Sequence, residues 1–269
     1  MFCLYESRFF MTFMSFSSWL ETAPAWVQGL PGGLQNFIFQ LFQTFVFADR
    51  WKLFANGLKI TFIVTLGALA LGVIIGLVLA IIRTLYCSYT VNKPPFILRV
   101  LNVFTETYLT VIRGTPMMVQ LLIMGFVIFV PKTEIGCIVC GILTLGINSG
   151  AYVAEIIRSG LMSIDRGQTE AGRSLGFNYA QTMFYIIIPQ AVKNILPALG
   201  NEMITLLKDT SLVSVIALRD VTKQAQNIQS LTYNALVPYI SLAAIYLVLV
   251  VGLTKLLAVF ERRLRKSEH

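Results

Sequence analysis

Charged side chains within long apolar stretches are the first candidates for chemistry in this sequence. Glu155 and Arg158 are three residues apart, so on a helix they share a face and can reach each other. Arg113 stands immediately before another uncharged apolar run. Such charges are costly in apolar surroundings and usually face a polar cavity or a partner. The pattern therefore indicates either a site for a charged solute or a structural ion pair.

Catalytic chemistry is largely excluded by the residue types. The only histidine is His269, so no histidine triad, histidine metal site or histidine general base can form among the apolar segments. Cys137 and Cys140 have the spacing of a redox or metal pair, but no second pair accompanies them and a packing role is the better interpretation. No glycine-rich phosphate loop occurs, so nucleotide hydrolysis would take place on another polypeptide. We expect no catalytic residue, no bound metal and no cofactor on this chain.

The composition is that of a membrane protein. Hydrophobic residues make up 56% of the 269 residues and charged residues only 13%, whereas globular domains carry about 25% charged residues. Uncharged runs such as residues 60–82 approach the roughly 20 residues that cross about 30 Å of hydrocarbon. An isolated strand there would leave its backbone polar groups unpaired. The sequence predicts an all-α integral membrane protein with about five core transmembrane helices, at residues 57–83, 100–130, 137–160, 180–205 and 236–258. The uncharged runs of the second and fourth, 114–131 and 179–192, fit spans that are bent or interrupted.

Basic residues set the expected orientation. The connector 83–99 contains Arg83, Lys93 and Arg99 without an acid, and residues 263–269 form a basic tail. Loops rich in lysine and arginine stay on the cytoplasmic side. We therefore expect a multi-pass protein of the cytoplasmic (inner) membrane with a cytoplasmic C-terminus. The net charge of +8 fits such loops beside membrane lipid and requires no nucleic acid.

Residues 1–54 form an N-terminal extension. An apolar stretch at residues 9–20 followed by Ala23-Pro24-Ala25 resembles a signal peptide, although the region before it has no basic excess. A helix lying at the membrane interface is expected next, because one helical face carries Leu34, Phe37, Ile38, Leu41 and Phe45. A sixth span or a cleaved segment is the alternative.

The loop at residues 161–178, between the third and fourth predicted spans, is charged and carries its own caps. Asp165 can cap the start of a short helix, and Gly176 stands where a left-handed residue ends one. Asn178 followed by Gln181 has the spacing of a capping box that opens the next span. A cytoplasmic elbow of this kind is expected to dock to another protein.

The same loop carries a family resemblance. Its match to the pattern E-A-A-x3-G-x9-I-x-L-P is made by Glu170, Ala171, Gly172, Gly176, Ile186, Ile188 and Pro189. Gly172 replaces the second alanine and Ile188 the leucine. The pattern resembles the coupling motif in membrane permease subunits of binding-protein-dependent ABC importers. Further stretches at 111–121, 148–176 and 206–216 resemble the polar amino-acid permeases, the histidine, glutamine and arginine group, and the likeness extends over residues 55–262.

The resemblance implies a type I importer permease fold over residues 55–262 and a mechanism shared among several chains. Two permease subunits, either identical or related, would form the pathway. A cytoplasmic ABC ATPase dimer would bind ATP and Mg, and an extracytoplasmic solute-binding protein would deliver the amino acid. Closure of the ATPases would be passed on through a cytoplasmic coupling helix, with the residues Glu170, Ala171, Gly172, Arg173 and Gly176.

A basic and an acidic group would suit the carboxylate and ammonium of an amino acid. The expected pathway residues are therefore Arg113, Gln120, Asn148, Tyr152, Glu155 and Arg158. In the competing interpretation Glu155 and Arg158 form only a structural pair near the cytoplasmic end of their span. The alternative function is a secondary amino-acid transporter without an ATPase, although five spans without an internal repeat fit that plan poorly. The sequence does not identify the amino acid.

Overall fold

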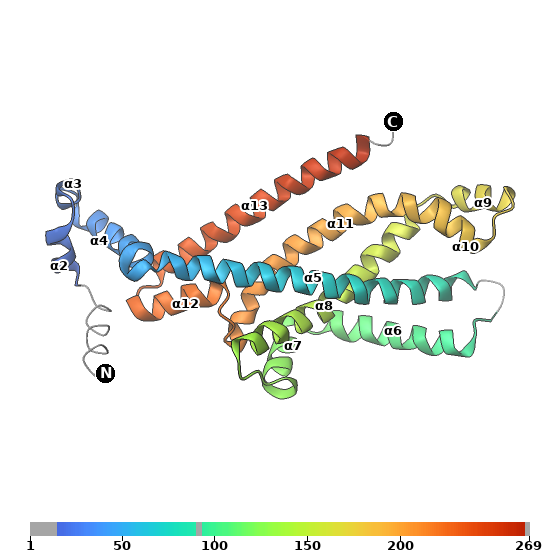
Figure 1. The fold of residues 1–269 in the computed structure, drawn as a ribbon, viewed down its shortest axis with the longest axis horizontal. Helices are drawn as coiled ribbons and strands as arrows, with labels where there is room; N and C mark the ends of the chain where they lie inside the picture. The colour runs from blue at the N-terminus through green and yellow to red at the C-terminus, as the bar shows by residue number, and fades with distance from the viewer. Residues whose placement is uncertain (1–14, 90–92, 267–269) are drawn as a thin grey trace. The chain divides into compact units, whose positions relative to one another are not determined.

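Every regular element in the described part of the chain, residues 15–89 and 93–266, is a helix in this computed structural model (Figure 1). The chain divides into two compact units, one of residues 62–218 with the end of the chain from 249, the other of residues up to 61 with 219–248. α5 (Trp51–Ser88) and α13 (Leu236–Lys266) contribute to both. Outside the described residues lie 1–14, which begin the signal-like stretch, 90–92 of the first connector and 267–269 of the basic tail.

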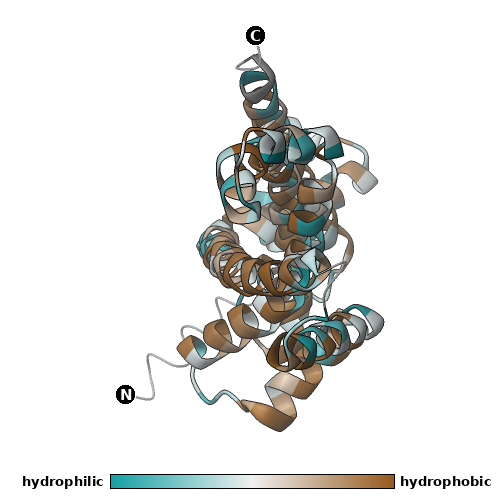
Figure 2. Cartoon of the chain, turned by 90° about the vertical axis from the view of Figure 1, so that its right-hand side faces the viewer, coloured by the Kyte–Doolittle hydropathy of each residue, from teal (hydrophilic) through white to brown (hydrophobic). Residues whose placement is uncertain are grey.

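The five predicted spans are present, and one of them is broken. Four are apolar helices or helix runs at Trp51–Ser88, Glu134–Met162, Tyr179–Ile216 and Leu236–Arg263. The fifth consists of Phe96–Gly114 and Met117–Ile128, which meet at 103°. Figure 2 shows long stretches of helix made of hydrophobic residues. The all-α membrane fold is confirmed, with helices that extend beyond most of their expected ends.

The larger unit contains the elements that position the candidate sites. Besides most of α5 they are, in chain order, α6 (Phe96–Gly114), α7 (Met117–Ile123), the π-helical turn η3 (Met124–Ile128), α8 (Glu134–Met162), α9 (Arg166–Ser174), α10 (Tyr179–Thr182), the π-helical turn η4 (Met183–Ile187), α11 (Ile188–Asp209) and the 3-10 helix η5 (Thr210–Ile216). In Figure 1, α6 runs alongside the C-terminal half of α5, and an ion pair between Arg83 and Glu106 joins the two.

The break in the second span follows from its proline. A residue that precedes proline is pushed out of the helical region, and Thr115 accordingly has φ −113° and ψ 140°. Pro116 then caps α7, where its missing N–H removes no helical hydrogen bond. The sequence predicted a bent or interrupted span over residues 100–130, and the structure divides it into two helices that meet at a steep angle.

α5 and α8 pack closely because glycines remove side chains from their contact. A Cβ atom on Gly76 would lie 2.6 Å from Cγ1 of Val153, and one on Gly72 would lie 2.9 Å from Oγ of Ser149. Both distances are shorter than a carbon atom tolerates. Small residues at such positions let transmembrane helices approach each other, and here they fix the half of α8 that carries the polar residues.

The other unit contains the N-terminal extension. α2 (Phe16–Thr22), α3 (Ala25–Gln28) and α4 (Gly32–Leu41) enclose an aromatic cluster around Trp19 and Phe39. At about 1.5 Å per residue, α4 alone is too short to cross a membrane. Phe39 is the buried residue of α4, whereas Leu34 and Phe37 of the predicted apolar face are exposed. The interfacial role of the extension stays a prediction.

Candidate functional site

The loop between α8 and α10 begins and ends its helices with the caps that the sequence predicts. The carboxylate of Asp165 accepts a 2.6 Å hydrogen bond from the backbone N–H of Gly167 and so caps α9. Asn178 and Gln181 form a reciprocal capping box at α10, with both hydrogen bonds at 2.9 Å. Each cap satisfies backbone donors that a helix start leaves unpaired. The loop is therefore a short, well-defined helix between two fixed ends.

The C-terminal end of α9 is closed by a Schellman motif. The N–H of Gly176 donates to the carbonyl of Arg173 at 3.0 Å, and the N–H of Phe177 donates to the carbonyl of Gly172 at 3.1 Å. Gly176 has a φ of +86°, a region that costs residues with side chains roughly 1–2 kcal/mol. The left-handed glycine at this position confirms the prediction for the end of the helix.

The family pattern has alanine where this chain has Gly172, and the packing of α9 explains the difference. It is the buried residue of α9, and a Cβ there would lie 2.8 Å from Cδ1 of Ile186 and 2.9 Å from Cγ2 of Thr182. Glycine thus lets α9 rest directly on the start of the next span. The neighbouring motif residues Glu170, Ala171 and Arg173 are exposed, which leaves them available to a partner.

Two side-chain contacts tie this loop to α11. Nε2 of Gln190 lies 3.2 Å from Oε1 of Gln168 on α9, and Nδ2 of Asn194 donates to Oγ of Ser163 at 2.9 Å. With the caps and the buried Gly172, these contacts join α9 to the span that follows it. Direct side-chain contacts therefore hold α9 and the loop before it against α11.

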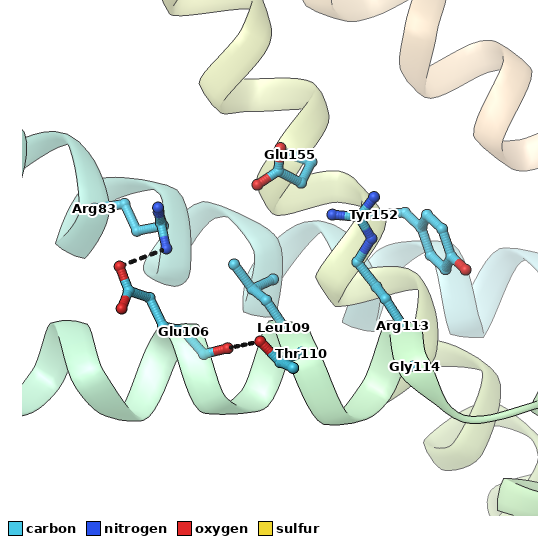
Figure 3. A pocket seen from close by; sticks show the side chains of 8 residues that line it. All are labelled: Arg83, Glu106, Leu109, Thr110, Arg113, Gly114, Tyr152 and Glu155. Atoms are coloured by element: carbon cyan, nitrogen blue, oxygen red, sulfur yellow. Dashed lines mark hydrogen bonds and ion pairs between the residues drawn. The ribbon is translucent and has the colours of Figure 1, made fainter.

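A polar pocket of about 590 Å³ lies between α5, α6 and α8 (Figure 3). Its lining residues come from three helices and are Arg83, Glu106, Leu109, Thr110, Arg113, Gly114, Tyr152 and Glu155. Helical spacing brings them together, since Glu106, Thr110 and Arg113 are four and three residues apart on α6. Two arginines and two glutamates therefore meet in one cavity among apolar helices.

Three of the predicted pathway residues line this pocket, and a fourth supports it. The guanidinium carbon of Arg113 lies 5.6 Å from the centre of the Tyr152 ring, within the range of a cation–π contact. Arg158 binds both carboxylate oxygens of Glu155, at 2.8 and 3.3 Å, and does not line the pocket itself. The predicted Glu155–Arg158 pair is present, and it presents Glu155 to the cavity.

Gln120 and Asn148 bind each other instead of lining this pocket. Nδ2 of Asn148 donates to Oε1 of Gln120 at 3.0 Å. The amide nitrogen of Gln120 lies 2.8 Å from the carbonyl oxygen of Ile112 and 2.7 Å from Oγ1 of Thr115. Both hydrogens of that amide form hydrogen bonds at the break between α6 and α7. Gln120 therefore stabilises this break.

Arg83 and Glu106 are pocket residues that the sequence patterns did not single out. Nη1 of Arg83 lies 3.3 Å from Oε1 of Glu106, and Figure 3 shows the pair at one end of the cavity. In the sequence, Arg83 was identified only as one of the basic residues of the connector 83–99. Glu106 could have been found as a carboxylate inside the second predicted span, where an ionised group is functional by default.

Comparison with known proteins now decides the family. Residues 96–266 match the family described as the binding-protein-dependent transport system inner membrane component. The match spans more than half of the 269 residues. The chain belongs to this permease family.

Relatives and solved structures agree with the family. The permease is 40% identical over 208 residues to the arginine transport system permease protein ArtQ of Bacillus subtilis, which covers 76% of this chain and 91% of the relative. It is 36% identical over 215 residues to the glutamine transport system permease protein GlnP of Escherichia coli K12, covering 79% and 93%. A crystal structure of an amino acid ABC transporter with histidines superposes with a TM-score of 0.70 at 45% identity, covering 79% of this chain and 94% of that one. The methionine ABC transporter MetNI shares the fold, with a TM-score of 0.57 at 19% identity over 80% and 94% of the chains.

The permease is thus an inner membrane component of an ABC importer, with the type I fold. The predicted family and fold are confirmed, and the secondary-transporter alternative loses its support. In residues 15–89 and 93–266, no group of three or more histidine, cysteine, aspartate or glutamate side chains could hold a metal ion. Cys140 is buried and Cys137 half-buried within α8.

Proposed function

We propose that this permease conducts a polar amino acid across the cytoplasmic membrane by alternating access, driven by ATP hydrolysis on a separate ABC ATPase dimer. The observation that carries the proposal is the pocket in which Arg83, Arg113, Glu106 and Glu155 meet among apolar helices. A zwitterionic amino acid has one group for each sign of charge, and charge-assisted hydrogen bonds to both would hold it. Relatives named for arginine and for glutamine transport support the same class of cargo.

Each side chain of the pocket has a proposed role. Arg113 has an aromatic neighbour but no ion pair within the described residues, so its guanidinium is available to the carboxylate of the amino acid. Glu155, held in position by Arg158, accepts from the ammonium. Tyr152 orients Arg113. Gln120 and Asn148 act indirectly, because their hydrogen bond stabilises the break in the second span.

The conformational change of the ATPase would be transmitted to the permease through α9. The exposed Glu170, Ala171 and Arg173 are proposed to contact a cleft on the ATPase, while Gly172 and Gly176 fix the seat and exit angle of the helix. ATP and Mg would bind to the ATPase subunits alone, since the sequence has no phosphate loop. The capped helix would then move with α11 as one body.

Two further partners complete the proposed importer. None of the most apolar window of the span Leu236–Arg263 is buried within the chain, which leaves it for lipid and for a second permease subunit, identical or related. An extracytoplasmic solute-binding protein would deliver the amino acid on the side opposite α9. The basic residues of the connector 83–99 and of the tail support a cytoplasmic position for both segments and for the C-terminus.

Uptake of labelled arginine, histidine and glutamine by cells with and without the permease tests the proposal. We expect uptake of at least one of them to depend on the permease, to continue when a protonophore collapses the proton gradient while ATP is kept high, and to stop when ATP is depleted. Uptake that follows the ion gradient and ignores ATP would contradict the proposal and favour secondary transport.

A further inference from the structure

The N-terminal extension is folded, although the permease family does not account for it. The family match begins at residue 96, and the ArtQ relative, matched over 91% of its own length, covers only 76% of this chain. A large part of the extension therefore has no counterpart in that relative. Within it, α2, α3 and α4 pack together (Figure 1), with Trp19, Ala23 and Val27 buried against Phe39. A packed element of this kind, added to a complete permease, calls for a role of its own.

An apolar groove of about 490 Å³ lies on the extension. Residues 19–27 of α2 and α3 form one wall, and residues 38–46 of α4 and the π-helical turn η1 (Phe42–Val46) form the other. The hydroxyl of Thr22 faces this groove, but it donates to the carbonyl of Trp19 at 2.9 Å. The volume is within the range of roughly 300–1,000 Å³ that is typical of ligand sites. We refer to this feature as the extension groove.

The rim of the extension groove is apolar and exposed. Trp26 is 67% exposed and Val46 is 60% exposed. Leu34 and Phe37, also exposed, share the helical face of α4 that lines the groove and so extend its apolar surface. Exposed apolar surface of this kind marks a site of contact with a protein, a ligand or a membrane.

The scarcity of charge favours hydrocarbon as the occupant. Glu21 is the only charged residue among residues 15–48. A docking surface for another protein usually surrounds its apolar centre with a polar rim that sets the orientation of the partner. A hydrocarbon chain needs no such rim. The extension groove therefore suits a lipid chain better than a protein partner.

The opposite side of α4 indicates that the extension lies at a membrane boundary. Asn36 and Gln40, four residues apart on α4, line a second cavity of about 490 Å³ together with residues 232–235. The uncharged run of the last span starts at Ala235, so residues 232–235 are at the level where that span meets the lipid headgroups. α4 thus turns amides to this polar cavity and its apolar side away from it. Trp26 on the rim fits the same level, since tryptophan is enriched at membrane interfaces.

We propose that the extension groove binds a hydrocarbon chain of a phospholipid in the extracytoplasmic leaflet, with Trp26 at its mouth in the headgroup region. The inference goes beyond the proposed function, and only the choice of leaflet rests on the orientation given there. The bound lipid would cover the apolar rim and hold the extension, together with the start of α5, at the membrane surface.

Tryptophan fluorescence tests the contact with lipid. Trp19, Trp26 and Trp51 are the only tryptophans of the chain, so the difference in emission between the wild type and Trp26→Phe isolates Trp26 in the complete transporter. In lipid nanodiscs, phospholipids brominated on their acyl chains should quench this difference at least twofold, and iodide in the water should quench it little. Strong quenching by iodide without quenching by brominated lipid would place Trp26 in water and overturn the proposal.

A phospholipid with a diazirine near the end of one acyl chain tests the groove itself. Illumination should attach it to peptides that contain residues 19–27 or 38–46, and Ile38→Asp should lower this labelling at least fivefold. Asn36→Asp is the matched control, because it places the same charge on the polar side of α4 and should leave the labelling unchanged. Equal labelling in the wild type and Ile38→Asp, or no labelling of these peptides in the wild type, would contradict the proposal. The wild-type results decide the matter even if Ile38→Asp does not fold.

Two further measurements separate the alternatives. The intact mass of the purified permease should include the extension, because cleavage after Ala25 would remove one wall of the groove and overturn the proposal. Protection of Trp26 from iodide by an added solute-binding protein, without quenching by brominated lipid, would assign the groove to that protein instead. Amino-acid uptake is measured in the same preparations. Uptake without lipid contact would contradict the groove assignment alone, and lipid contact without uptake would contradict the importer function alone.

Discussion

Asn148 on α8 donates a 3.0 Å hydrogen bond to the side-chain carbonyl of Gln120 on α7. The amide nitrogen of Gln120 in turn reaches the carbonyl of Ile112 at the end of α6. One side chain therefore spans the break in the second span and fastens it to α8. Backbone groups freed by a helix break at membrane depth need such partners, because lipid offers none.

We predict that Gln120→Leu lowers stability by about 1–3 kcal/mol, the cost of leaving buried polar groups without a partner. Uptake of all transported amino acids should fall together. Thermal unfolding of the purified transporter and an uptake panel measure the two effects. Asn148→Ala is the milder comparison, since it leaves the contacts of Gln120 to Ile112 and Thr115 intact. A changed preference among amino acids with unchanged stability would instead place Gln120 in contact with the cargo.

Gly176→Leu should abolish uptake while the protein still reaches the membrane. The φ of +86° at this residue would force a leucine into a region that costs roughly 1–2 kcal/mol, so the exit angle of α9 would change. Gly176→Asn is the matched control, because asparagine enters the left-handed region more readily, and it should keep part of the uptake. Wild-type uptake in the leucine variant would remove the basis for the coupling role of this loop.

Glu155→Gln should reduce uptake about tenfold or more, because a charge-assisted hydrogen bond contributes roughly 1.5–3 kcal/mol. The loss should be similar for cationic and neutral amino acids if Glu155 binds the common ammonium group. Initial rates over a range of concentrations for one cargo of each type provide the measurement. If neither rate nor preference changes, Glu155 and Arg158 form only a structural pair.

Local sequence patterns predicted the structure of the loop at residues 161–178 well. Asp165, Gly176 and the pair Asn178 and Gln181 act through hydrogen bonds within a few residues, so their caps follow from order along the chain. The membrane spans could be predicted equally well, because the length of an uncharged apolar run determines whether it can cross a membrane. The sequence also favoured a bent or interrupted second span, and Thr115 before a proline is the place where it breaks, but no local pattern encodes the 103° angle.

The composition of the pocket could be predicted only in part. Arg113, Tyr152 and Glu155 stood out as polar residues in apolar surroundings, and the structure brings them into one cavity. Arg83 joins them only because α6 packs along α5, a contact between residues 23 positions apart that no local spacing encodes. The contact between Glu202 and Ser149, 53 positions apart, has the same origin.

Asp220 predicts a pH dependence of stability. Its carboxylate caps α12 (Val221–Thr232), accepting from the N–H groups of Thr222 and Lys223 at 3.0 and 2.9 Å. Asp220 is fully buried, and this burial raises the pKa of its carboxyl from 3.8 to about 6. Between these two values the folded state holds a proton that the unfolded state has released. The free energy of unfolding should therefore be highest below about pH 4 and should fall as the pH rises to about 6, by roughly 1.4 kcal/mol per pH unit at most.

Asp220→Asn isolates this contribution. Asparagine caps a helix about as well as aspartate but carries no charge to bury, so the variant should be about 1–2 kcal/mol more stable than the wild type at pH 8, after allowance for one weakened hydrogen bond. The difference should disappear or reverse at pH 4, where the wild-type carboxyl is protonated in the folded state. Apparent melting temperatures of the two purified proteins at pH 4, 6 and 8 measure it. A constant offset across that range would mean that Asp220 stays ionised in its buried position and that its two backbone hydrogen bonds outweigh the cost of burial.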